Sequence, residues 1–146
     1  MHDATPEDCA QLAPNLRQAD RDEVLAASGK APLAALLHGY MESSECYAVR
    51  CGGQAIAIFG VVNLGGGEGA PWLLGSDAIL SHWREFVRHS RQELERIRQP
   101  YRRLWNFVDA RNTLHRRWLA WLGAEETELE PHYGVARLPF WRFDFV

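Results

Sequence analysis

The stretch that decides the fold is PWLLGSDAILSHWREFVRHSRQELERIRQPYRRLWNFVDARNTLHRRWLAWLGA, residues 71–124. It predicts a short apolar strand that ends in Gly75-Ser76-Asp77, a long amphipathic helix, a second apolar strand over residues 104–108 and a second helix. If the two strands are parallel, the helix between them is a βαβ crossover. The ends of both strands then lie beside the starts of both helices, and we expect a ligand there.

The long helix is predicted over residues 81–99, with Ser81 as its N-cap and Pro100 as its stop. The second helix begins near Asn112 and closes at Gly123, because glycine commonly follows the last helical turn. Helical spacing predicts a long helix that buries one side against the sheet. The buried stripe contains Trp83, Phe86, Val87, Ser90, Leu94 and Ile97.

The flanking sequence supplies three helices before the stretch and strands on both sides of it. Helix-start residues and Gly or Pro stops predict helices over residues 6–12, 18–28 and 32–41. Strands are expected over residues 46–51 and 54–64 as a hairpin, with a last strand over residues 141–146 after a further tail strand. The fold class is therefore α/β (α+β), with helices packed on one mixed sheet.

Length and composition are those of a single globular domain that spans residues 1–146. The 47% hydrophobic and 24% charged content argues against disorder, and no apolar run is long enough to span a membrane. The acidic, polar start of the chain is unlike a signal peptide. Three cysteines without C-x-x-C spacing predict no disulfide framework and a cytoplasmic location, and the scattered histidines predict no metal site.

The charge pattern is uneven although the net charge is only −3. Ten of the fifteen arginines lie between Arg84 and Arg117, and the acids gather near the N-terminus and around residues 125–130. This arginine-rich face could hold phosphate or carboxylate groups, or it could be a solvated helix face. The net charge argues against a nucleic-acid partner.

The order of elements, together with several short stretches, resembles the GNAT superfamily of acetyl-CoA-dependent N-acetyltransferases. Phage-encoded GNAT-like proteins related to the podoviral internal virion protein A are the most similar in type. The resemblance covers nearly the whole chain. The stretches that carry it are RQADRDEVLAASG (17–29), WLLGSD (72–77), WREFVRHSR (83–91), NFVDARN (106–112), RWLAWLGA (117–124) and LPFWRFDF (138–145).

The resemblance implies a mixed, mostly antiparallel sheet whose central parallel strands splay apart, with helices on both faces. In the family, acetyl-CoA enters this splay as the small-molecule acyl donor, and its pyrophosphate binds where the strand meets the long helix. A helix start suits an anion because its backbone N–H groups are unpaired. The implied cofactor-binding residues are Leu74, Gly75, Ser76, Asp77, Ser81, His82, Arg84 and Asn112, the last beside the pantetheine arm.

The sequence also departs from the family pattern. Its loop lacks the basic and glycine residues of the usual pyrophosphate motif, and Asp77 would cost roughly 1 kcal/mol beside a pyrophosphate unless Arg84 or Arg88 neutralises it. Where many members carry a tyrosine that protonates the leaving thiolate, this chain has Leu119. No catalytic residue is singled out by spacing. The candidates for proton transfer are Glu68, Asp109 and His115, with Asp77 and His82 as further bases.

Two hypotheses of function follow. The first is an acetyl-CoA-binding N-acetyltransferase with an atypical pyrophosphate loop. The second is a catalytically degenerate GNAT-fold module, encoded by a bacteriophage, that binds a host bacterial protein or forms part of the virion. The missing tyrosine and the six tryptophans favour the second, since Trp and Arg often anchor interfaces. The last strand could also pair with a second copy in a homodimer.

Overall fold

The computed structural model describes residues 2–145. A two-residue strand, β1 (His2–Asp3), precedes three helices and a 3₁₀ turn: α1 (Pro6–Leu12), η1 (Ala13–Asn15), α2 (Gln18–Ser28) and α3 (Pro32–Glu42). Helix α1 begins with a capping box, in which the Thr5 hydroxyl accepts from the Asp8 N–H and the Asp8 carboxylate accepts from the Thr5 N–H. The predicted boundaries of the first two helices agree with the structure, and α3 extends one residue further.

The sheet has seven strands in the order β1-β2-β3-β4-β5-β7-β6. All neighbours are antiparallel except β4 and β5. This arrangement confirms the expected mixed, mostly antiparallel sheet. The remaining strands are β2 (Glu45–Cys51), β3 (Gln54–Gly65), β4 (Glu68–Gly75), β5 (Arg103–Asp109), β6 (Ala124–Tyr133) and β7 (Leu138–Phe145).

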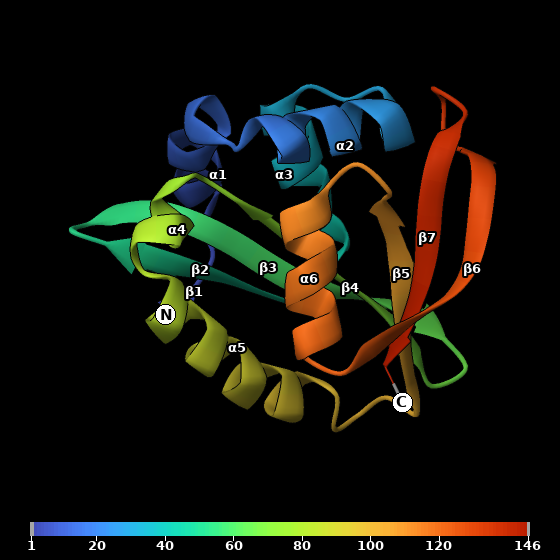
Figure 1. Ribbon diagram of the computed structural model, residues 1–146. Helices are drawn as coiled ribbons and strands as arrows, with labels where there is room; N and C mark the ends of the chain where they lie inside the picture. Colours follow the sequence, from blue (N-terminus) through green and yellow to red (C-terminus); the bar gives the residue numbers. More distant parts are fainter. Residues whose placement is uncertain (1, 146) are drawn as a thin grey trace.

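The central parallel strands diverge almost at once. Strands β4 and β5 pair at Glu68 with Arg103 and at Gly69 with Leu104, and no further pairs join them among residues 2–145. Figure 1 shows β3 and β4 running across the view, while β5 and β7 run from top to bottom. The carboxyl ends of β4 and β5 are therefore far enough apart to admit other groups.

Helices cover both faces of the sheet. Helices α1, α2 and α3 lie together on one face, and α5 (Trp83–Ile97) and α6 (Thr113–Trp121) lie on the other (Figure 1). We call these the packed face and the cavity face. The packed face centres on Leu12, Leu36 and Ile58, which are fully buried. No helix in residues 2–145 combines the length and apolar character that a transmembrane helix requires.

The long helix differs from its prediction. Residues 78–81 form a separate short helix, α4 (Ala78–Ser81), and α5 begins at Trp83 after a break at His82. Ser81 is therefore the last residue of α4, and α5 begins without a side-chain cap. The single-helix prediction with Ser81 as N-cap was wrong, because apolar spacing is the same on both sides of a one-residue break.

The C-terminal strand is longer than predicted and lies inside the sheet. Strand β7 begins at Leu138 and pairs with β5 on one side and β6 on the other. Its backbone is therefore already hydrogen-bonded on both edges, which leaves no edge for pairing with a second copy. The edge strand on this side of the sheet is instead β6, which is exposed, acidic and contains Pro131. Charged residues and proline on an edge strand disfavour pairing with another chain. Val146, placed in the predicted strand, lies outside the described residues.

Candidate functional site

The gap between β4 and β5 is bridged by the start of α2. On the β4 side, Gly75 donates its N–H to Asp20 Oδ2 (3.0 Å), and its carbonyl accepts from the Arg17 N–H (2.9 Å). On the β5 side, the Asp109 N–H donates to Glu23 Oε1 (2.8 Å). Two acidic side chains thus satisfy the strand ends that the divergence of the sheet leaves without partners.

Asn112 completes this bridge. It is 1% exposed, and its side-chain amide donates to Asp20 Oδ1 (2.9 Å) and Glu23 Oε1 (3.4 Å). Its own Oδ1 accepts from an Arg17 guanidinium nitrogen (3.5 Å). The polar groups of Asn112 are therefore engaged within the protein, so the asparagine positions α2 against the strand ends.

Burial decides the ionisation of the groups in the gap. Burial raises the pKa of Glu23 to about 8, and repulsion from Asp20 and Asp109 acts in the same direction. The hydrogen bonds from the Asp109 N–H and from Asn112 act in the opposite direction, because they favour the charged carboxylate. Burial also lowers the pKa of His115, whose side chain is 9% exposed. His115 Nδ1 lies 3.8 Å from Glu23 Oε2. At neutral pH the imidazole is thus uncharged and can accept a proton, with a protonated carboxyl beside it.

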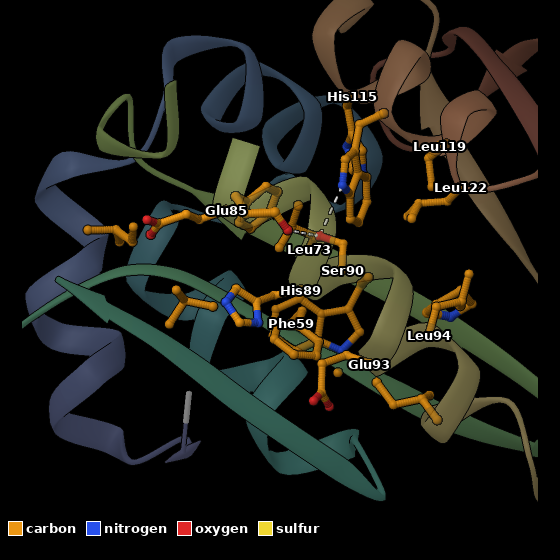
Figure 2. A pocket seen from close by; sticks show the side chains of 18 of the residues that line it. Phe59, Leu73, Glu85, His89, Ser90, Glu93, Leu94, His115, Leu119 and Leu122 are labelled. Carbon is orange, nitrogen blue, oxygen red and sulfur yellow. Dashed lines mark hydrogen bonds between the residues drawn. The ribbon is translucent and has the colours of Figure 1, made fainter. Parts of the chain in front are cut away.

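Two hollows meet at the divergence of the strands. A small one, of about 10 Å³, lies between the starts of α5 and α6 beside Arg17 and Asp20. A larger cavity, of about 330 Å³, lies between α5, α6 and the sheet (Figure 2). Both hollows are lined by Leu73, Phe86, His115 and Trp118. The two helix starts thus open on a common cleft, as the stretch from residue 71 to 124 predicts.

The predicted loop residues have mixed surroundings. Gly75 and Ser76 are buried, and Ser76 binds β3 through its N–H and the Ala78 N–H through its hydroxyl. Leu74 points into the packed face, away from the cleft. Asp77 is exposed and precedes α4.

Ser81, His82 and Arg84 lie at the break between α4 and α5. Ser81 and Arg84 are exposed, while His82 Nε2 lies 3.2 Å from Cys51 Sγ at the rim of the cavity. Among residues 2–145 no ion pair joins Asp77 to Arg84 or Arg88. The first-turn amides of α5 have no partner within the helix, and Arg84 lies in the same turn.

The three catalytic candidates lie in different places. Glu68 is at the opposite end of β4, where it accepts from Trp105 Nε1 (2.7 Å) and pairs with Arg102 (3.5 Å). Asp109 is buried and paired with Arg111 at 2.7 Å, outside the walls of either hollow. His115 lines both hollows, so it alone of the three borders the cleft.

Asp20 and Glu23 were missed as site residues by sequence reasoning, which placed them only as acids early in a helix over residues 18–28. Residues 20, 23 and 26 recur at a spacing of three along α2, and the structure buries all three. An acid at both i and i+3 of a buried face requires polar partners elsewhere in the chain. Those partners, Gly75 and Asp109, are far away in the sequence.

Comparison with solved structures identifies the fold of this chain. No protein-family model matches the sequence, and no curated protein matches it. Solved structures do match, at low identity and over nearly the whole chain. The structure of AAC(6')-Ib in complex with ribostamycin and coenzyme A is 15% identical, with a TM-score of 0.72 over 99% of this chain and 91% of that one.

Two bacterial structures give the same result. An acetyltransferase of the GNAT family from Bacillus anthracis is 8% identical, with a TM-score of 0.68 over 99% of this chain and 92% of that one. The ribosomal-protein-S18-alanine N-acetyltransferase from Escherichia coli is 14% identical, with a TM-score of 0.66 over 96% of this chain and 86% of that one. The chain therefore has the GNAT fold, as the sequence resemblance predicts.

Proposed function

We propose that the protein is an acyl-CoA-dependent N-acetyltransferase whose donor lies in the cleft between β4 and β5. One observation carries this proposal: the backbone of Leu73 faces the gap between the diverging strands, at the junction of the two hollows. The GNAT fold and the coenzyme A named in the AAC(6')-Ib structure support it.

The direction of the Leu73 backbone follows from the alternation of β4. Ser76 donates its N–H to Ile56 of β3, so Gly75 and every second residue before it face β5. The Pro71 carbonyl accepts from Asn106 Nδ2 (3.0 Å), and Gly75 is bound by α2. Between them, the N–H and C=O of Leu73 have no partner on β5 or α2 among residues 2–145. An extended arm with amide groups, such as pantetheine, would pair with them as an added strand does.

The phosphates of the donor would then reach the first turn of α5. Its unpaired N–H groups and the positive end of the helix favour an anion, and Arg84 and Arg88 on the same helix add charge. Asp77 opposes this, but it precedes α4, across the His82 break from these amides. This position replaces the glycine-rich loop that the sequence lacks.

The proposed reaction transfers an acyl group from the thioester sulfur to a primary amine. The amine nitrogen forms a bond with the thioester carbonyl carbon, the carbon–sulfur bond breaks, and the amine loses a proton to the neutral His115. The thiolate takes a proton from water, because Leu119 has none to give. The Glu23 carboxyl lies next to His115, with Oε2 3.8 Å from the imidazole Nδ1.

Titration of acetyl-CoA by calorimetry, followed by an assay of thiol release with a panel of primary amines, tests this function. His115→Gln should lower turnover by about 100-fold or more and leave acetyl-CoA affinity within about threefold. His132→Gln is the matched control, because His132 is exposed on β6. Absence of binding heat at high micromolar concentrations of acetyl-CoA and of longer acyl-CoA esters would overturn the proposal.

The alternative remains a phage-encoded, catalytically degenerate module that binds a host bacterial protein or serves in the virion. The observation in its favour is Leu119, a buried leucine that cannot protonate a thiolate. This alternative predicts that no thiol is released from acetyl-CoA with any amine. A stoichiometric complex with one bacterial protein, formed equally well by the His115→Gln variant, would favour this alternative.

A further inference from the structure

We propose that the large cavity receives the acyl chain of the donor, and that the preferred donor carries a medium-length chain of about six to ten carbons. This inference rests on the proposed function, because it assumes a CoA thioester in the cleft. It goes beyond that function by naming which thioester the chain takes.

The size of the cavity carries the first step. Its volume of about 330 Å³ is far larger than an acetyl group requires. An apolar cavity of about 150 Å³ in a protein core stays dry and holds benzene, which has six carbons. A space of twice that size beneath α5, open to solvent at its rim, therefore has room for a longer chain.

The chemistry of the walls carries the second step. Phe59, Leu94, Leu119 and Leu122 supply apolar surface from β3, α5 and α6 (Figure 2). The Ser90 hydroxyl, in the middle of the cavity wall, donates to the Phe86 carbonyl (2.6 Å) and accepts from Trp118 Nε1 (3.2 Å). The Ser90 hydroxyl is thus already hydrogen-bonded within the protein, so this part of the wall does not need a polar ligand.

The charges lie at the rim. Glu85 and His89 are exposed, and Glu93 pairs with Arg96 at 2.7 Å. A charged acceptor amine would meet the Glu85 and Glu93 carboxylates, which also line the cavity, at its rim, but it would lose its hydration among the apolar residues of the interior. The cavity therefore fits a hydrocarbon chain better than it fits the amine substrate.

Continuity with the donor site carries the third step. Leu73, Phe86, His115 and Trp118 line both the small hollow and the cavity. A thioester paired with the Leu73 backbone would hold its carbonyl carbon beside His115. The rest of the acyl chain would then extend past Phe86 and Trp118, under α5.

The test compares CoA, acetyl-CoA and octanoyl-CoA in calorimetric titrations of the intact protein. Each buried methylene contributes about 0.8 kcal/mol, so octanoyl-CoA should bind at least about tenfold more tightly than acetyl-CoA. Equal affinity for the two esters would overturn the inference and leave the proposed function standing. Absence of binding by all three ligands would instead overturn the proposed function.

Two variants give a matched comparison. Leu94→Trp fills the cavity from α5 and should reduce octanoyl-CoA affinity to the level of acetyl-CoA, while acetyl-CoA affinity changes by less than about threefold. Leu25→Trp adds the same side chain to an exposed position of α2 and should change neither. An equal loss for both esters in Leu94→Trp would contradict the inference. If Leu94→Trp does not fold, the wild-type comparison of chain lengths decides alone.

Free octanoate serves as the last control. The inference expects it to bind at least about tenfold more weakly than octanoyl-CoA, because the CoA moiety holds the chain at the cavity entrance. Octanoate binding as tight as that of octanoyl-CoA would assign the cavity to a free fatty acid and overturn the inference.

Discussion

The packed face and the cavity face of the same sheet are built in opposite ways. On the packed face, α3 approaches so closely that a Cβ at Gly39 would lie 2.7 Å from the Trp72 ring. On the cavity face, α5 is fifteen residues long and strongly amphipathic, yet residues along its length line a cavity of about 330 Å³ that separates it from the sheet. Large side chains near both ends of α5 reach the sheet, and its middle stands over the cavity.

This difference shows that an amphipathic pattern indicates which side of a helix faces the sheet, but not how closely the helix packs against the sheet. Small residues such as Gly39 permit close approach, whereas Trp83 and Phe86 place bulky side chains between α5 and the sheet. The proposed chemistry lies on the loosely packed face, where a ligand can supply missing contacts. The packed face supplies the stability that such an arrangement requires.

The largest expected effect is a contrast between two leucine truncations. Leu36→Ala, on the packed face, should lower the free energy of unfolding by about 2–5 kcal/mol, because Leu36 is fully buried. Leu122→Ala, in the cavity wall, should cost less than about 2 kcal/mol, because one side of this leucine already lacks neighbours. Urea denaturation of both variants measures the difference. Equal losses would mean that the cavity collapses in solution.

The next effect concerns the buried acid between the two faces. The pKa of Glu23 is raised from 4.5 to about 8, so the folded protein holds a proton that the unfolded chain releases. The stability contributed by this protonation is complete below pH 4.5 and is lost as pH rises through about 8. Glu23→Gln should remove that slope and stabilise the protein at pH 8 by about 1–3 kcal/mol relative to wild type.

Denaturation at several pH values checks this expectation, with Glu128→Gln on exposed β6 as control. His115 has the opposite slope, because its lowered pKa makes it lose stability as pH falls below 6.5. The difference between wild type and Glu23→Gln isolates the carboxyl. A wild-type slope that survives in Glu23→Gln would contradict the raised pKa.

The smallest effect is at the contact that ties α5 to α6. The Arg91 guanidinium lies 3.6 Å from the centre of the Trp121 ring and donates to the Trp121 carbonyl (3.2 Å). Arg91→Ala should cost only about 0.5–1 kcal/mol, because the pair is exposed. It should nevertheless speed hydrogen exchange in α5 more than in α3. Unchanged exchange in α5 would show that this contact does not hold the helix over the cavity.

Much of the fold could be predicted because its signals are local. The Thr5–Asp8 capping box, the Gly29 stop and the alternation of β7 are all set within a few residues. The break at His82 could not be predicted, since both α4 and α5 keep the same apolar side towards the sheet. The three cysteines are free.

The site was less accessible to sequence reasoning. The position of the cleft followed from the crossover rule, and His115 was among the candidates that the sequence suggested. Asp109 was suggested for proton transfer and Asn112 for cofactor binding, and in the structure both form hydrogen bonds to α2. No rule of local spacing distinguishes a ligand-binding polar group from one that bonds within the protein.

The sequence by itself determined the order of elements and the side of the sheet on which a ligand is expected, because periodicity, caps and crossover handedness act over short distances. Only the tertiary structure decided what stands in the gap. Glu23 meets the backbone of Asp109 across 86 residues, and Asn112 meets Asp20 across 92. The size of the cavity likewise depends on how far α5 stands from the sheet. That distance is set by side chains from several elements packing together, which no single stretch of sequence encodes.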